Sequence, residues 1–314
     1  MLESIALEYP DDLAVIAYHA WWPNSGDPYY QYNISENSGR INYYVADYTP
    51  HLWIDGNVDG QWLTNTWESK IVSDMAVESP IAINLVVDHD EVTGTGTIDA
   101  VISATEPITY TNLYVRFAIT ESDLPPIHYY TQPIEYALRD MVTNITGQSL
   151  TIAQGDVVTK STSYTLNPTF DFENLEIVAF VQSDNGKRVL QAAKFTLPGP
   201  HVTVYPTGEI TVPKGGTLYF DSVVQNYRDN SVNGDFWLSA VLPNGNEVTI
   251  PESYLNLPNP LSGEITGWDS ISFSHELSIP TSHVPIGTYS LVGNIGQFPN
   301  VVIERTSFDF TITN

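Results

Sequence analysis

The segment Asp55-Gly-Asn-Val-Asp-Gly60 contains the residue types that bind a hard cation. Asp55, Asn57 and Asp59 alternate along the chain, like the oxygen ligands in the first half of a calcium loop, which converge on one ion. The twelfth position of such a loop supplies a bidentate glutamate, but here it is Thr66. Asp, Asn and Gly also favour ordinary turns. We therefore expect a turn, and we keep calcium as an alternative for these three residues.

Aromatic residues gather at two points of the sequence where they could bind a flat ligand. One group follows an apolar segment near the start, and the other lies in an irregular stretch between Glu121 and Met141. Rings in loops stack on sugars or form the centre of protein-binding surfaces, although they also fill the cores of small domains. Packing is the simpler interpretation, so ligand binding by these residues is a hypothesis. The candidates are Trp21, Trp22, Tyr29, Tyr30, His128 and Tyr129.

The chain lacks complete catalytic motifs. It contains no cysteine, which excludes disulfides, thiolate metal ligands and a thiol nucleophile. Its 7 histidines show neither His-x-His nor His-Glu-x-x-His spacing, and no Gly-x-Ser-x-Gly or phosphate-binding loop occurs. Apart from calcium, we expect no cofactor. An unrecognised pair of carboxylates, of the kind that glycosidases use, leaves hydrolysis open, but binding is the stronger prediction.

The charge balance limits the partners of this protein. Its 314 residues include 37 acidic and 11 basic ones, which gives a formal net charge of −26. Such a surface repels the phosphates of nucleic acids and anionic lipid headgroups. No segment reaches the roughly 18 apolar residues of a membrane-spanning helix. The first ten residues are acidic and unlike a signal peptide. We expect an extracellular or cell-surface protein whose export signal is not part of this sequence.

Two breaks divide the sequence into three expected domains. Glu78-Ser79-Pro80 ends a helix-like stretch, and Leu197-Pro-Gly-Pro200 interrupts both helical and strand hydrogen bonding. The expected domains are residues 1–79, 80–198 and 201–314.

The second and third domains have the pattern of short β-strands. The turn Asp184-Asn-Gly-Lys187 suits a hairpin between strands at 175–182 and 189–195. Residues 270–279 alternate strictly between apolar and polar, as a strand with one buried face does. The regular spacing favours two β-sandwiches, the second of them immunoglobulin-like.

The first domain alternates between helix-like and strand-like segments, which is an α/β pattern. We expect helices at 2–8, 35–45 and 62–77, and short buried strands at 13–18 and 52–54.

The segment Tyr44-Val-Ala-Asp-Tyr-Thr-Pro-His-Leu-Trp-Ile-Asp-Gly56 resembles thioredoxins, in which a helix ends before Thr-Pro, a strand and an Asp-Gly turn. In that superfamily the peptide bond before the proline, here Pro50, is cis, and the proline lies beside the redox dithiol.

Residues 1–197 resemble the outer-membrane-protein-28-related family, in which a thioredoxin-like domain precedes a β-sandwich. Matching stretches are Leu138-Arg-Asp-Met141, Glu176-Ile-Val-Ala-Phe-Val-Gln182 and Val189-Leu-Gln-Ala-Ala-Lys194. The third domain resembles a generic accessory sandwich of secreted bacterial proteins.

The sequence departs from that family where redox chemistry would occur. In the family, a strand and a Cys-x-x-Cys turn precede the helix whose end corresponds to Leu2–Glu8, and this sequence starts after both. Without a thiolate, the chain cannot exchange disulfides. The absent strand would lie between residues 13–18 and 52–54. Since unpaired buried backbone groups cost about 1–3 kcal/mol each, we expect repacking there, or a strand from another segment or a neighbouring chain.

The sequence therefore predicts a multidomain, mainly β protein, with a small truncated thioredoxin-like α/β domain followed by two β-sandwich domains. We expect an exported, non-catalytic surface protein that acts in binding, adhesion or assembly. Its expected partner is a protein or glycan, and strand donation between subunits would give a homo-oligomer or filament. The alternatives are an extracellular hydrolase acting on polysaccharide, and a fragment of a thiol-disulfide redox protein whose Cys-x-x-Cys lies upstream.

Overall fold

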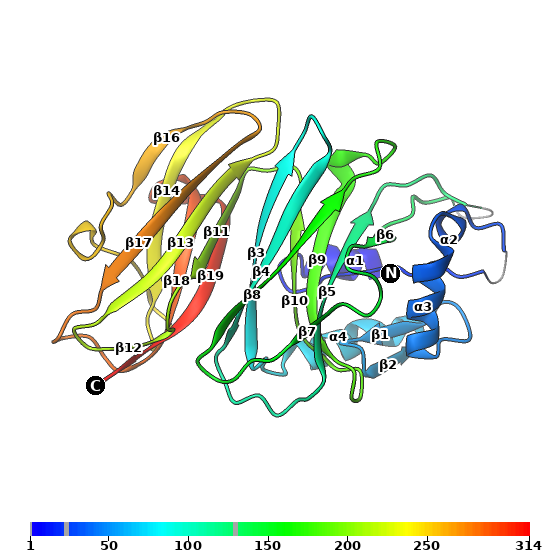
Figure 1. Cartoon of the computed structure of the whole chain (residues 1–314), viewed down its shortest axis with the longest axis horizontal. Helices are drawn as coiled ribbons and strands as arrows, with labels where there is room; N and C mark the ends of the chain where they lie inside the picture. Colours follow the sequence, from blue (N-terminus) through cyan, green and yellow to red (C-terminus); the bar gives the residue numbers. More distant parts are fainter. Residues whose placement is uncertain (1, 22–24, 128–130) are drawn as a thin grey trace. The chain divides into compact units, whose positions relative to one another are not determined.

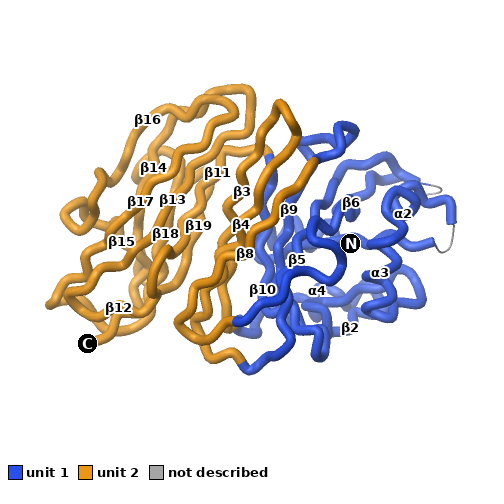
Figure 2. The backbone as a smooth tube through the Cα atoms, viewed as in Figure 1, with its two compact units in different colours: residues 1–79, 109–151, 166–197 blue, residues 80–108, 152–165, 198–314 orange. Residues whose placement is uncertain are grey.

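The structure is a computed structural model, shown in Figure 1, that describes residues 2–21, 25–127 and 131–314. The chain forms two compact units that each contain several separate segments, and we describe each unit by itself. Unit 1 comprises residues 1–79, 109–151 and 166–197, and unit 2 comprises residues 80–108, 152–165 and 198–314 (Figure 2). The units thus divide the predicted second domain between them, and the division into 1–79, 80–198 and 201–314 stays a prediction.

Two helices of unit 1 begin at polar residues that cap them. Asp27 accepts hydrogen bonds from the backbone amides of Tyr29 and Tyr30, and Asn33 accepts one from Glu36. The helices expected at 2–8 and 35–45 are confirmed, whereas the one expected at 62–77 is shorter. The helices are α1 (Leu2–Glu8), α2 (Pro28–Tyr32), α3 (Ile34–Tyr44) and α4 (Trp67–Met75), with 3-10 turns at Thr64–Thr66 and Phe172–Asn174.

A small hairpin in unit 1 consists of β1 (Leu52–Ile54) and β2 (Val58–Gln61). The Thr49–Pro50 peptide bond before it is cis, as the thioredoxin resemblance implies. Apolar side chains from β1, α1 and α4 form one cluster, which contains Ile54, Ile5, Trp67 and Ile71. Helices α1 and α4 therefore pack against the face of the hairpin to which Ile54 points.

The strand expected at 13–18 does not form. Ala17 makes an isolated parallel bridge to Ala137, in which its N–H donates to Tyr136 O at 2.8 Å and its carbonyl accepts from Leu138 N at 3.0 Å. The alternating side chains of Ala14, Ile16 and Tyr18 still pack on the larger sheet of unit 1. The apolar pattern correctly predicted burial, but a strand also needs a partner along its length.

The larger sheet of unit 1 has the order β10-β9-β5-β6, with β7 also paired to β5. The hairpin expected around Asp184–Lys187 is confirmed by the antiparallel pairing of β9 with β10. The strands are β5 (Leu113–Glu121), β6 (Ala137–Met141), β7 (Gln148–Leu150), β9 (Leu175–Ser183) and β10 (Val189–Thr196).

Unit 2 contains three sheets of antiparallel strands, with one short parallel pairing between β12 and β19. The three-stranded sheet β3-β4-β8 is formed by Ile81–Asp90, Thr95–Ala104 and Val157–Thr165. The three-stranded sheet β11-β13-β17 is formed by His201–Pro206, Thr217–Asn226 and Asp269–Ser278. The third sheet has the strand order β12-β19-β18-β14-β15, and β16 also pairs with β14. Its strands are β12 (Thr211–Pro213), β14 (Val232–Val241), β15 (Glu247–Thr249), β16 (Leu261–Ile265), β18 (Gly287–Gln297) and β19 (Val301–Thr313). A 3-10 turn lies at Glu252–Tyr254.

The last two of these sheets share one hydrophobic core. Phe220 on β13, Leu238 on β14, Leu291 on β18 and Phe308 on β19 belong to a single buried cluster. The strand predicted at 270–279 corresponds to β17, which pairs with β13 along its whole length. The mainly β class that the sequence predicts is therefore confirmed.

Candidate functional site

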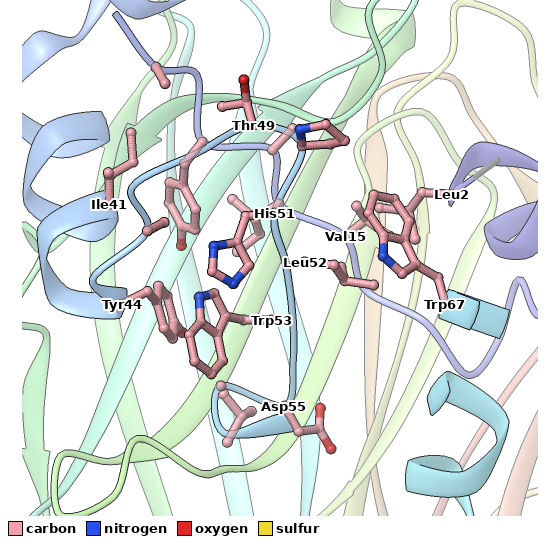
Figure 3. A pocket seen from close by; sticks show the side chains of 18 of the residues that line it. Leu2, Val15, Ile41, Tyr44, Thr49, His51, Leu52, Trp53, Asp55 and Trp67 are labelled. Carbon is pink, nitrogen blue, oxygen red and sulfur yellow. The ribbon is translucent and has the colours of Figure 1, made fainter. Parts of the chain in front are cut away.

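A cavity of about 380 Å³ lies in unit 1, between the extended segment 14–21, the loop 46–51 and strand β1 (Figure 3). Val178 and Phe180 of β9 also line it, as do Ile41 and Tyr44 near the end of α3. The lining is mostly apolar and aromatic, which is typical of small-ligand sites. We call this cavity the aromatic pocket.

A row of four stacked rings forms one side of the aromatic pocket. The ring centroids of Tyr48 and His51 are 4.3 Å apart with an interplanar angle of 5°, and those of His51 and Trp53 are 5.2 Å apart at 26°. Tyr44 extends the row, with its centroid 6.0 Å from that of Trp53. Figure 3 shows His51, Trp53 and Tyr44 together, with Leu52 projecting the other way, because successive residues of an extended chain point to opposite faces.

Two buried polar atoms in this row have no hydrogen-bond partner within the described part of the chain. They are Nδ1 of His51 and Nε1 of Trp53. His51 uses its other nitrogen, since Nε2 lies 3.0 Å from Oδ1 of Asp59. A buried polar atom without a partner costs about 1–3 kcal/mol. Both atoms are covered by protein, so this cost is part of holding the ring row in place.

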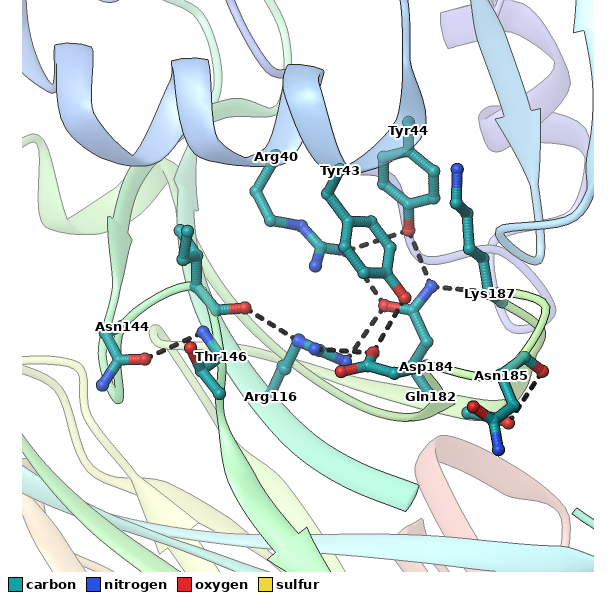
Figure 4. A network of polar contacts seen from close by, with 12 residues as sticks. Arg40, Tyr43, Tyr44, Arg116, Asn144, Thr146, Gln182, Asp184, Asn185 and Lys187 are labelled. Carbon is teal, nitrogen blue, oxygen red and sulfur yellow. Dashed lines mark hydrogen bonds and ion pairs between the residues drawn. The ribbon is translucent and has the colours of Figure 1, made fainter. Parts of the chain in front are cut away.

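A buried polar network holds Tyr44 in place (Figure 4). The Tyr44 hydroxyl accepts hydrogen bonds from Nη2 of Arg40 at 2.9 Å and from Nε2 of Gln182 at 3.0 Å. Arg116 donates to Oε1 of Gln182 at 3.2 Å and to Oδ1 of Asp184 at 2.8 Å. Burial raises the pKa of Tyr44, so its hydroxyl stays protonated. The row of rings is thus fixed at one end by the arginines of α3 and β5, together with Gln182 of β9 and Asp184, which follows β9.

The Arg40 guanidinium is also held by aromatic faces. Its side chain is fully buried, and its carbon Cζ lies 4.6 Å from the ring centroid of Tyr43 and 4.9 Å from that of Tyr44. Such cation–π contacts stabilise a desolvated charge by about 2 kcal/mol or more. The network is therefore a structural support of the pocket wall.

Two carboxylates share one arginine at the edge of the aromatic pocket. Arg188 contacts Oδ2 of Asp55 at 3.2 Å and both carboxylate oxygens of Asp74, at 2.9 and 2.8 Å. Desolvation by the surrounding protein raises the pKa of Asp55 to about 6, assisted by the Asp74 carboxylate and opposed by Arg188. Asp55 thus gains or loses a proton close to neutral pH, at a position that lines the cavity.

The structure does not bring the predicted calcium ligands together. Asp55 and Asn57 both turn toward Arg188, with 3.3 Å between Oδ1 of Asn57 and Nη1 of the arginine. Asp59 instead contacts His51 and accepts a hydrogen bond from the amide of Gln61. A guanidinium therefore occupies the side on which a cation would bind. Among the described residues, no group of three or more His, Asp or Glu side chains could hold a metal ion. Calcium binding stays a prediction without a formed site.

Of the aromatic residues predicted to bind a ligand, only Trp21 among those described lines the aromatic pocket, and it is 46% exposed. Tyr29 and Tyr30 are buried, and their hydroxyls bond to Pro125 O and Ser38 Oγ. Their packing role is thus the one observed. Trp22, His128 and Tyr129 lie outside the described residues.

Sequence reasoning missed the ring row of Tyr44, Tyr48, His51 and Trp53 as a site. A signal was present, because His51 directly precedes the strand predicted at 52–54 and Trp53 lies two residues further on, within it. That spacing places both rings on one face. The contribution of α3, however, depends on how the helix packs against the strand.

The fold and the site together define a mainly β protein whose helical N-terminal segment helps to form an aromatic pocket. Residues 37–198 match the family profile described as outer membrane protein Omp28, which spans just over half of the chain. The chain therefore belongs to the Omp28 family.

Solved structures provide further similarities at low sequence identity. A domain of the outer membrane lipoprotein Omp28 from Porphyromonas gingivalis is 20% identical, with 38% of this chain and 88% of that one covered and a TM-score of 0.30. HBP35 of Porphyromonas gingivalis is 12% identical over 93% of this chain and 84% of that one, with a TM-score of 0.46. A β-glucosidase from Listeria innocua is 11% identical over 36% of this chain and 16% of that one, with a TM-score of 0.25.

No curated protein sequence matches this chain significantly. Within residues 2–21, 25–127 and 131–314, no helix has the length and apolar character needed to span a membrane.

Proposed function

We propose that this chain is an exported, non-catalytic protein of the outer membrane or cell surface that binds a ligand in the aromatic pocket. The description of its family supports the location, and the net charge of −26 suits an exposed, soluble surface. The observation that carries the binding function is the row of four stacked rings, Tyr44, Tyr48, His51 and Trp53, that lines a cavity. The ligand is a segment of protein or a glycan, since both offer flat apolar faces and hydrogen-bonding groups.

The proposal includes the domain types that the sequence predicts. A thioredoxin-like origin of the first 79 residues is supported by the order of α3, cis Pro50, the β1–β2 hairpin and α4. An immunoglobulin-like sandwich at 201–314 is supported by the two sheets of unit 2 that share one core. The other predicted sandwich, within residues 80–198, is supported by the sequence pattern alone.

Binding is tested with fluorescently labelled protein on arrays of glycans and peptides. A Trp53→Ala variant removes one ring from the pocket wall, so we expect about tenfold weaker binding. A Trp62→Ala variant is the matched control, because Trp62 is 64% exposed and does not line the pocket. Equal binding by the wild type and both variants would contradict the proposal.

The pair of Asp55 and Asp74 supports a second candidate, the hydrolysis of polysaccharide. A carboxyl with a pKa of about 6 beside a second carboxyl group resembles the paired acids of glycosidases. Release of sugar from a polysaccharide by the wild type, lost in Asp55→Asn, would favour this function over binding. The redox alternative depends on sequence outside this chain and stays a prediction.

A further inference from the structure

A separate cavity of about 210 Å³ lies in unit 2, at one end of the core that its two larger sheets share. Residues 232–236 of β14 and strand β16 form one wall, and Ile271 and Phe273 of β17 lie on the facing wall. The described residues that line it all belong to unit 2. We call it the core-end cavity.

A pair of glycines opens this cavity in the wall formed by β14 and β16. Three cross-strand pairs follow one another there: Val232 with Ile265, Gly234 with Gly263, and Phe236 with Leu261. Because side chains alternate along a strand, all three pairs point to the face on which Phe236 joins the core. A Cβ atom added to Gly263 would have no heavy atom of another described residue within 4 Å, its chain neighbours apart. The inner face therefore has a hole the size of a side chain.

The same core is filled away from this hole. Leu218 of β13 and Phe310 of β19 are buried there. Beside the cavity, Leu261, Ile265 and Phe273 pack against the core but are only partly buried. Protein interiors are packed as densely as organic crystals, and the atoms that line a void lose dispersion contacts. An apolar group that enters the cavity would restore those contacts.

The core-end cavity is accessible from solvent. Gly263 and Ile303 line it, and both are exposed. Ile303 is 56% exposed and follows two further exposed apolar residues, Val301 and Val302. A small molecule can therefore enter while the two sheets stay packed.

The size and lining of the cavity suit one aromatic ring. Phe236 and Phe273 both line it, with ring centroids 6.1 Å apart and an interplanar angle of 7°. A further ring gains favourable contacts with such a pair. An apolar cavity of about 150 Å³ holds a benzene molecule. The core-end cavity therefore has space for one ring with a short chain.

The charge near the cavity disfavours an anionic ligand. Asp235 and Glu264 belong to the strands that line it, and no basic residue does so among those that the structure describes. Hydrogen bonds from the Ser262 hydroxyl and the Phe298 amide lower the pKa of Asp235, which stays ionised. Both acids alternate with the inner-face residues, so their carboxylates point to the other face of the sheet. They repel an anion through their field without offering a partner to a cation.

We propose that the core-end cavity of unit 2 binds a small uncharged molecule that carries an aromatic ring on a short chain. The ring occupies the space beside Gly234 and Gly263 and packs against Phe236 and Phe273. This site shares no residue with the aromatic pocket among the described residues, so the proposal and the proposed function can fail separately.

The probe is 3-phenylpropanol, added to the full chain labelled at its isoleucine methyl groups and observed by NMR. Ile265, Ile271 and Ile295 line the core-end cavity, whereas Ile16 and Ile41 line the aromatic pocket. We expect saturable shifts of the first three methyl signals, with a Kd below about 1 mM. We also expect nuclear Overhauser contacts between these methyl groups and the phenyl protons.

Two matched compounds test the ligand class. The saturated twin, 3-cyclohexylpropanol, lacks the aromatic contacts, and we expect it to bind at least about threefold more weakly. The anion 4-phenylbutyrate has the same ring and chain but a carboxylate in place of the hydroxyl. We expect it to bind at least about tenfold more weakly at low salt.

A Gly263→Leu variant tests the location of the site. The backbone of Gly263 lies outside the left-handed region and a Cβ atom has space there, so the new side chain should fill the cavity and weaken binding at least about tenfold. Gly208→Leu is the matched control, because a Cβ atom at Gly208 would make only ordinary contacts with Tyr219 outside the cavity. It should bind like the wild type. The methyl spectrum of each free variant checks its fold.

Several outcomes would overturn the proposal. Shifts confined to Ile16 and Ile41 would place the probe in the aromatic pocket, and a lack of saturable shifts would mean that the core-end cavity stays empty. Unchanged binding by a folded Gly263→Leu variant would exclude this location. Equal binding of either matched compound would contradict the ligand class. Shifts of the cavity methyl signals with protein concentration alone would make a second copy the occupant. If Gly263→Leu does not fold, the Overhauser contacts in the wild type decide.

Discussion

His51 in unit 1 and His275 in unit 2 both stack on aromatic rings, but their surroundings differ. His51 lies between Tyr48 and Trp53 beside a cavity, whereas His275 lies on Phe220 with a centroid distance of 4.7 Å in the closed core of unit 2. Both have an Nδ1 without a partner among the described residues. A stacked imidazole with an unpartnered nitrogen is therefore not by itself evidence of a ligand-binding site. The cavity beside His51 distinguishes it from His275.

The strands explain why one environment is closed and the other is open. His275 belongs to β17, which pairs along its whole length with β13, and β13 pairs on its other edge with β11. His51 precedes β1, which has three residues and one paired edge. Long paired strands place a continuous row of side chains against the facing sheet, which closes the core. A short hairpin leaves one strand edge unpaired and packs only part of its face.

The largest expected effect concerns the closed core. Phe220→Ala should lower the free energy of unfolding by about 3–5 kcal/mol, because Phe220 is fully buried and packs against His275 and Phe308. Trp53→Ala should cost less than half as much, since one side of its ring adjoins the pocket. Both are measured by calorimetry. Equal losses would show that Trp53 is core rather than pocket wall.

The next effect is the pH dependence of the closed core. Burial lowers the pKa of His275 to about 4, from an ordinary value of 6.5. The unfolded chain then binds more protons between these pH values, so stability is present above pH 6.5 and is lost as pH falls toward 4. We expect a loss of about 2–3 kcal/mol over this range. Denaturant unfolding of His275→Gln should lack this loss, and His51→Gln should retain it.

A smaller effect of opposite sign is expected at the pocket. The pKa of Asp55 is raised to about 6 from 3.8, so the folded state holds this proton more tightly, and stability is lost as pH rises from 4 to 6. Because 45% of the side chain is exposed, we expect the loss to stay below about 1 kcal/mol. Asp55→Asn should flatten this part of the stability profile. A stability profile of the His275→Gln variant that rises from pH 4 to 6 would contradict the assignment.

The smallest effect concerns the backbone that leads from α3 into the pocket loop. Val45 ends α3 in the left-handed conformation with φ 59°, and it is 71% exposed. A β-branched residue is strained there, whereas asparagine is tolerated, so Val45→Asn should stabilise the fold by about 0.5–1 kcal/mol. Thermal unfolding measures this gain. A destabilised variant would show that the Val45 side chain contributes packing near the pocket.

Much of the fold could be predicted from local pattern. The helices at 2–8 and 35–45 and the hairpin of β9 and β10 were predicted from local sequence pattern and an Asn-Gly turn. The segment 13–18 shows the limit of such patterns, because alternation predicts which side chains are buried but not whether a neighbouring strand exists. The aromatic pocket was missed for a related reason, since α3 and β1 contribute their rings from separate elements.

The sequence alone determined the acidic charge, the lack of any thiol and the mainly β character, because these depend on composition and on contacts between near neighbours. The tertiary structure decided that Asp55 and Asn57 face Arg188 instead of a cation, and that His51 and Trp53 line a cavity while Tyr29 and Tyr30 are packed. Those outcomes depend on which distant segments pack together, and burial, hydrogen bonding and pKa follow from that packing.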